Sequence, residues 1–333
     1  MPNKQRPGRL GLTWAALIVL LGLLSLAAIA VGSAGYSLGE ILQALASPEA
    51  STVKVVVRSL RLLLAVLIGA SLSASGALLQ SVMRNPLADP GTIGVSAGAG
   101  TAATTILLLF PRLTGTVPLF AFIGAALACA LIYSLAWKGG VDPTHIILSG
   151  VAVNSVLGAY NSLLQMLHSD DLEGVLAFLN GSLSGRSWVQ VRVLAVYAGM
   201  GLLLALCCVK TANALQLGDE MARSLGVKVN LARVLLSAVS AFLAAATVSV
   251  AGMIGFVGLV VPHIARILVG SDYKAMLPTS MLLGAVVLLL ADTLGRTVVP
   301  GMEIPVGIVM SVVGGPFFLY MLRKGRSARG NQG

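Results

Sequence analysis

The sequence predicts an all-α polytopic membrane protein with about ten transmembrane helices. The 333 residues are 57% hydrophobic and only 10% charged, whereas a soluble domain carries about 25% charged residues. The scarcity of charge also leaves long uncharged windows, and a helix that crosses a bilayer needs about 20 apolar residues. We therefore expect lipid to surround most of this chain.

Nine uncharged windows follow one another, at residues 10–39, 62–83, 90–111, 113–137, 143–169, 193–209, 234–265, 275–291 and 304–322. The window at 234–265 is too long for one straight helix and contains helix-interrupting residues, namely Gly252, Gly255, Gly258 and Pro262. We divide it into two spans, the second running past Arg266, which makes ten. The polar connections are too short for a soluble domain, so residues 1–333 are expected to form a single transmembrane domain.

The first window also resembles a secretory signal, because basic residues precede it and the small-residue sequence Ala28-Ile29-Ala30 lies within it. The apolar region of a signal is about 7 to 15 residues long. This window is longer, so we expect a retained first span and keep a cleaved signal as the alternative.

The basic residues predict the orientation, since cytoplasmic loops carry an excess of Lys and Arg. Basic clusters lie near both ends of the chain, which places both termini in the cytoplasm and requires an even number of spans. With ten spans, 15 of the 22 Lys and Arg residues fall on the cytoplasmic side. Spans 2–5 then run opposite to spans 7–10, as in an inverted repeat.

Composition and motifs argue against several function classes. The basic residues do not cluster on a polar domain and only 5% of residues are aromatic, so no nucleic-acid partner is expected. The chain has no GxxxxGK[ST] phosphate loop, so it is not expected to hydrolyse ATP. Its three cysteines lie in apolar runs and are expected to be core residues (Cys129, Cys207 and Cys208). We predict no catalytic residues, metal site or cofactor.

An ion-coupled secondary carrier is an alternative class, but such carriers keep an ionisable residue at mid-membrane. The nearest candidates, Asp292 and Arg296, lie near the outer end of the ninth span, four residues apart, where they can pair along one helix face. A structural or signalling subunit without a pathway is a third alternative, which composition does not exclude.

Two polar connections point to function. Residues 213–229 place Leu215, Leu217, Met221, Ala222 and Leu225 at helical spacing, which predicts a short amphipathic cytoplasmic helix. Such a helix lies on the membrane surface or inserts into a groove of a partner. The second connection, RNPLADP at 84–90, contains two prolines that break the backbone and forms either a plain connection or a gate.

Six ordered segments carry a family resemblance that covers nearly the whole chain. They are RSLRLLLAVLIGASLSASGALLQSVMRNPLADPGTIGVSAGAG at 58–100, HIILSGVAVNSVLGA at 145–159, LNGSLSGRSW at 179–188, LQLGDEMARSLGV at 215–227, GMIGFVGLVVPHIARILVGSDYKAMLP at 252–278 and EIPVGIVMSVVGGPFFLYMLRK at 303–324. Together they resemble the permease subunits of ABC importers for iron-siderophore, haem and cobalamin, the FecCD-like family of type II importers.

The resemblance implies a ten-span permease subunit in a bacterial cytoplasmic membrane that moves an iron complex, most commonly a ferric siderophore, by alternating access. Haem and cobalamin are the alternative cargoes. The implied partners are a second permease, identical or closely related, two ATP-binding subunits that hydrolyse ATP, and an extracytoplasmic substrate-binding protein.

The resemblance also implies roles for individual residues. The ATPase coupling helix would comprise Leu217, Gly218, Asp219, Glu220 and Arg223. Three arginines that lie outside, against the orientation bias, would receive acidic residues of the binding protein, namely Arg58, Arg61 and Arg296. The cytoplasmic gate would include Asn85, Leu87, Pro143 and Thr144, although Pro143 replaces the hydroxyl residue more usual in the family.

Overall fold

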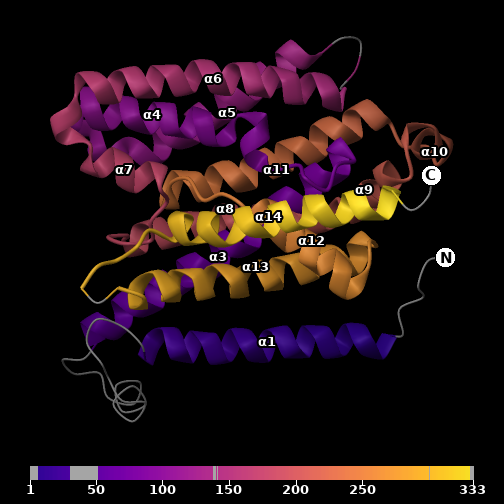
Figure 1. Ribbon diagram of the computed structural model, residues 1–333, viewed down its shortest axis with the longest axis horizontal. Helices are drawn as coiled ribbons and strands as arrows, with labels where there is room; N and C mark the ends of the chain where they lie inside the picture. Colours follow the sequence, from indigo (N-terminus) through magenta and orange to yellow (C-terminus); the bar gives the residue numbers. More distant parts are fainter. Residues whose placement is uncertain (1–6, 31–51, 138–139, 141, 300, 331–333) are drawn as a thin grey trace.

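The computed structural model describes residues 7–30, 52–137, 140, 142–299 and 301–330, and these residues form a bundle of helices (Figure 1). Among the described residues, seven helices are long and apolar enough to cross a membrane: α1 (Pro7–Ala30), α3 (Thr52–Met83), α5 (Val117–Ala136), α6 (Pro143–Leu167), α8 (Trp188–Cys207), α11 (Val229–Ala251) and α13 (Tyr273–Thr297). Three more contain shorter apolar stretches: α4 (Val95–Leu109), α12 (Val257–Val269) and α14 (Val306–Gly330). The prediction of about ten transmembrane helices in an all-α protein is confirmed.

Short helices connect these spans. They are η1 (Pro90–Ile93), η2 (Pro111–Thr116), η3 (Ser169–Asp171), α7 (Glu173–Leu179), α9 (Val209–Gln216) and α10 (Asp219–Ser224). The described part of α1 begins at the end of the bundle that carries α9 and α10, and α14 ends there too (Figure 1). We call this the α10 end and the opposite one the α7 end. The shared end agrees with an even number of crossings, while the inverted repeat stays a prediction.

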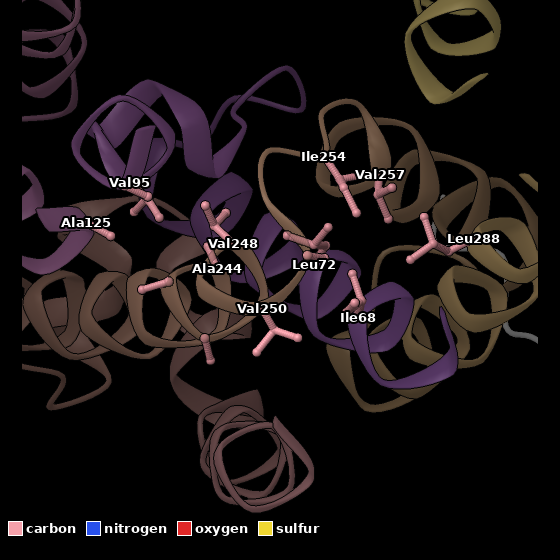
Figure 2. Packing of buried hydrophobic residues seen from close by; sticks show 14 of the residues in the cluster. Ile68, Leu72, Val95, Ala125, Ala244, Val248, Val250, Ile254, Val257 and Leu288 are labelled. Atoms are coloured by element: carbon pink, nitrogen blue, oxygen red, sulfur yellow. The ribbon is translucent and has the colours of Figure 1, made fainter. Parts of the chain in front are cut away.

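Helix α3 forms the centre of the bundle and packs against α8, α11, α12 and α13. Figure 2 shows the apolar side chains that fill this centre, among them Ile68 and Leu72 of α3, Val248 of α11 and Leu288 of α13. All four side chains are buried. Because neither lipid nor water reaches them, dense packing rather than exclusion from water holds these helices together.

Glycines set the closest helix contacts. Gly69 of α3 lies against the backbone of Gly284 on α13, and Gly76 of α3 lies against Gly258 on α12. A Cβ on Gly76 would come within 2.5 Å of the Gly258 Cα, so no larger residue fits at this helix separation. Between α3 and α11, the hydroxyls of Ser75 and Ser240 lie 2.9 Å apart and hydrogen-bond each other. Small residues thus bring α3 close to three neighbours.

The long window at 234–265 is interrupted as predicted. Helix α11 ends at Ala251, and α12 starts only at Val257, after two residues with positive φ, Gly252 (+77°) and Phe256 (+65°). This break is hydrogen-bonded to the end of α7 and to the loop that follows α7: Met253 N donates to Phe178 O (2.9 Å), and Ser182 N donates to Ala251 O (2.8 Å). Non-helical backbone inside a membrane is tolerated where protein covers and satisfies it, as here.

The prediction for the cysteines is right for Cys129, which is buried on α5, and wrong for Cys207, whose side chain is exposed on α8. Apolar sequence around Cys207 indicates only an apolar environment. In a membrane protein the lipid is as apolar as the core, so burial does not follow from an apolar sequence.

Candidate functional site

The predicted amphipathic helix is present at the α10 end as two short helices, α9 and α10, joined at Leu217 and Gly218 (Figure 1). Gly218 has φ +98°, a conformation that favours glycine and that turns the chain between the two helices. Leu215 and Ala222 are buried against the spans. Leu217, Met221 and Leu225 are each more than half exposed, so α10 presents an apolar edge away from the bundle.

A reciprocal pair of hydrogen bonds fastens α9 to the start of α13. Asn213 donates from Nδ2 to Asp272 Oδ1 (2.7 Å), and its Oδ1 accepts from Tyr273 N (2.9 Å). Asp272 also caps α13 by accepting from Lys274 N. This backbone hydrogen bond, the Asn213 amide and the Lys274 charge hold the pKa of the Asp272 carboxyl below its ordinary value, so Asp272 is an anionic cap at neutral pH.

The five residues predicted to contact an ATPase differ in orientation. Glu220 and Arg223 are exposed, and Leu217 lies on the apolar edge. Asp219 instead points toward the spans, where its Oδ1 accepts from Arg233 Nη2 of α11 at 2.9 Å. The Nη1 of Arg84, the residue after α3, lies 3.8 Å from the same oxygen.

The predicted gate residues lie in two places. Pro143 and Thr144 form the first turn of α6, which Asp142 caps by accepting from Thr144 N (2.7 Å). Asn85 closes a tight turn after α3, because its Oδ1 accepts from Leu87 N (2.9 Å). A polar cleft of about 700 Å³ is lined by Pro143 and Thr144 together with Arg84, Asp219, Arg223 and Arg233, but not by Asn85 or Leu87. The structure thus brings two of the four predicted gate residues, Pro143 and Thr144, to the same cleft as Asp219 and Arg223.

At the α7 end, two of the three arginines predicted to dock a partner converge on one buried carboxylate. Arg61 of α3 donates from Nε to Asp292 Oδ1 (2.9 Å), and Arg296 Nε lies 3.2 Å from Asp292 Oδ2. The Asp292 side chain is 2% exposed, and those of Arg61 and Arg296 are 14% and 10% exposed. The third arginine, Arg58, lies three residues earlier on α3, and its side chain falls outside the described part of the chain. The predicted pairing of Asp292 with Arg296 is confirmed.

Glu303, in the loop before α14, completes this cluster. Its Oε2 accepts from Arg61 Nη1 at 2.9 Å, and about half of the side chain is exposed. Burial by itself raises the pKa of the Glu303 carboxyl. The hydrogen bonds from Arg61 and Ser184 and the positive charges of Arg61 and Arg296 outweigh burial, so the pKa lies below its ordinary value. Neither the role of Glu303 nor the Arg61–Asp292 pair was predicted from the sequence, because the residues are far apart in the chain. The charged residue in EIPVG was the one signal that pointed to Glu303.

Two positive charges and two negative charges therefore meet at the α7 end, and an amphipathic segment with an exposed apolar edge lies at the α10 end. A comparison with models of known families matches residues 17–324 to one described as the FecCD transport family. The chain belongs to the FecCD transport family. The chain is accordingly a multi-pass membrane protein of the transport-permease type, as its helices indicate.

Individual relatives agree with the family. The Fe(3+)-citrate import system permease protein YfmE of Bacillus subtilis (strain 168) is 42% identical over 264 residues, which are 79% of each chain. The cobalamin import system permease protein BtuC of Halobacterium salinarum is 41% identical over 83% of this chain and 75% of the relative. The hemin transport system permease protein HmuU of Yersinia pestis is 36% identical over 94% of this chain and 96% of the relative.

A solved structure has the same fold. It is described as an inward-facing conformation of a provisionally assigned metal-chelate type ABC transporter, and it superposes with a TM-score of 0.84 at 29% identity, covering 95% of this chain and 99% of that one. The FecCD permease fold therefore extends over nearly all of the chain.

Proposed function

We propose that this FecCD permease is the membrane subunit of an ATP-driven importer that carries a ferric chelate of the siderophore class across the bacterial cytoplasmic membrane. Family membership supports the transport role. The basic residues support an orientation with the α10 end in the cytoplasm, because Arg84, Arg223, Lys228 and Lys274 all lie at that end. The α7 end then faces outward, with both termini inside.

The observation that carries the ATP-driven mechanism is the exposed apolar edge of α10. This edge consists of Leu217, Met221 and Leu225, and it lies at the end where the family resemblance predicts that the ATPase binds. Leu215 and Ala222 are buried and hold the segment to the spans. An apolar helix edge of this kind suits insertion into a groove of a partner. Two ATP-binding subunits would move the coupling segments of two permeases, identical or closely related, and open the pathway between them to alternate sides.

The outward arginines would receive an extracytoplasmic binding protein, through Arg58, Arg61 and Arg296. Their cluster suits this role if an incoming carboxylate competes with Glu303, the more exposed of the two acidic partners. The cytoplasmic gate would comprise Asn85, Leu87, Pro143 and Thr144. Of these, Pro143 and Thr144 line the polar cleft together with Asp219 and Arg223.

The cargo proposal draws on the relatives. Two of them are named as permeases for Fe(3+)-citrate and one for iron(3+)-hydroxamate, whereas single relatives are named for cobalamin and hemin. A ferric chelate is therefore the first choice, and haem and cobalamin are the alternatives that an uptake assay separates.

The decisive test is uptake by cells that lack the gene and by cells that re-express it. Radioiron-labelled siderophores, ferric citrate, haem and labelled cobalamin are supplied with and without depletion of ATP. Restored, ATP-dependent uptake of a ferric chelate supports the proposal and names the cargo. Restored uptake of haem or cobalamin alone overturns the cargo, and uptake that follows a proton or sodium gradient without an ATPase overturns the mechanism.

A second test addresses the coupling edge directly. Met221→Asp places a charge on the exposed edge of α10 and is expected to remove the ATPase from the purified transporter without unfolding the permease. Lys274→Gln, an exposed change at the same end, is the matched control. An ATPase that stays bound to the Met221→Asp permease would argue against this edge as its docking site.

A further inference from the structure

Asp219 is the first residue of α10, yet its carboxylate is turned away from the surface that α10 presents. Its side chain is 27% exposed, and its Oδ1 accepts from Arg233 Nη2 at 2.9 Å. The Arg233 side chain is only 6% exposed. The next residue, Glu220, is exposed. Two adjacent carboxylates of one short helix thus face different surroundings, and only Glu220 is placed to meet a partner.

Three parts of the chain meet at Asp219. Arg84 follows the last residue of α3 and lies 3.8 Å from the Asp219 carboxylate, and Arg233 lies in the second turn of α11. Arg84 has φ +46°, which is unusual for a residue with a side chain. The neighbouring Gly218 has φ +98°, and a Cβ there would lie 3.5 Å from Arg84 Nη1. Backbone with positive φ thus lies next to the ion pair in both segments, at Arg84 after α3 and at Gly218 before α10.

The same residues border the start of α6. Arg84, Asp219, Arg223 and Arg233 line the polar cleft of about 700 Å³ together with Pro143 and Thr144. A displacement of α10 that is transmitted through Asp219 would therefore reach α3, α11 and the wall of this cleft at once. By contrast, α9 is held to the start of α13 through Asn213, a contact that does not involve Asp219.

We propose that Asp219 is a positioning residue that transmits movement of α10 to α11 and α3 through Arg233 and Arg84, rather than a residue that contacts the ATPase. This inference rests on the proposed function, because it presupposes an ATPase that moves α10. A charge-assisted hydrogen bond to a nearly buried arginine is short and directional, so it resists separation better than the apolar contact of Ala222 alone. The contact with the ATPase is then made by Glu220, Arg223 and the apolar edge of α10.

The test uses the complete transporter in lipid nanodiscs and liposomes, with the permease, its ATPase and its binding protein, and measures cargo moved per ATP hydrolysed. In Asp219→Asn the ATPase should stay bound and hydrolyse ATP, while the transport-to-hydrolysis ratio falls about tenfold, a usual size for coupling between sites. The exchanged pair Asp219→Arg with Arg233→Asp should recover part of the ratio. Glu220→Arg, the neighbouring change, should instead reduce the amount of bound ATPase.

Arg84→Gln keeps the test informative if Asp219→Asn folds poorly, because the Arg84 side chain is 45% exposed and its loss leaves no buried charge. It should lower the same ratio by a smaller factor. An unchanged ratio in Arg84→Gln and in a folded Asp219→Asn overturns the proposal, as does loss of the ATPase from Asp219→Asn. Wild-type transport without an ATPase would refute the proposed function itself.

Discussion

Arg61 and Asp292 are 231 positions apart in the chain, yet the Arg61 Nε lies 2.9 Å from the Asp292 Oδ1. This pair joins α3 to α13, the same two helices that approach closely at Gly69 and Gly284. Arg296, one turn from Asp292, holds the other oxygen of the carboxylate. The ends of two central helices are thus connected where the α7 end would receive a partner.

Asp292→Asn should destabilise the permease strongly. The change removes the one charge that two nearly buried arginines share, and breaking a buried ion pair costs about 3–5 kcal/mol. Thermal unfolding in detergent measures the loss. Glu303→Gln is the matched control, since Glu303 is 49% exposed and exposed pairs contribute less than about 1 kcal/mol. Equal losses in the two variants would contradict the difference in burial.

Glu303 should make the α7 end sensitive to acid. Its pKa is lower in the folded chain than in the unfolded chain, so its pair with Arg61 contributes stability above the unfolded pKa of about 4.3. That contribution is lost as the pH falls below about 4.3 and through the folded pKa. The unfolding temperature of the wild type should therefore fall more steeply below pH 4.3 than that of Glu303→Gln. Parallel pH profiles would show that Glu303 contributes nothing.

Gly76→Ala should destabilise the contact between α3 and α12. The new Cβ would lie within 2.5 Å of the Gly258 Cα, and overpacking of this kind costs about 1–3 kcal/mol because the helices must separate. Gly199→Ala on α8 is the control, because no atom beyond the backbone of its own helix lies within 4 Å of the added Cβ. Alanine favours a helix over glycine by up to about 1 kcal/mol, so this control should be neutral or stabilising. Equal unfolding temperatures for both variants would refute the close contact.

Docking of the extracytoplasmic binding protein on the permease is best tested first at Arg58. Reversal of Arg61 or Arg296 also breaks the Asp292 cluster, so a loss of docking there does not separate recognition from stability. Arg58→Glu should weaken binding of the binding protein and make the remaining affinity less dependent on salt. Surface plasmon resonance at several salt concentrations measures both effects. Lys274→Glu at the α10 end is the charge-matched control, and unchanged affinity in Arg58→Glu would remove Arg58 from the docking site.

Local sequence patterns predicted the features that depend on neighbours along the chain. Uncharged windows predicted the spans, because each crossing needs its own apolar stretch. The glycines after Ala251 predicted the break between α11 and α12. The four-residue spacing of Asp292 and Arg296 predicted their ion pair along α13. Helical spacing also predicted the amphipathic segment at 213–229, although it forms two helices with a turn at Gly218.

The sequence by itself determined the membrane-spanning architecture, the family and the position of the amphipathic segment around α10, because helix formation and apolar length are properties of contiguous residues. Only the tertiary structure decided that Arg61 shares Asp292 with Arg296, that Glu303 joins them, and that Asp219 faces Arg233 while Glu220 faces outward. Those contacts depend on the rotation and relative height of packed helices. Close packing at pairs such as Gly76 and Gly258 sets these quantities, and no local pattern encodes them.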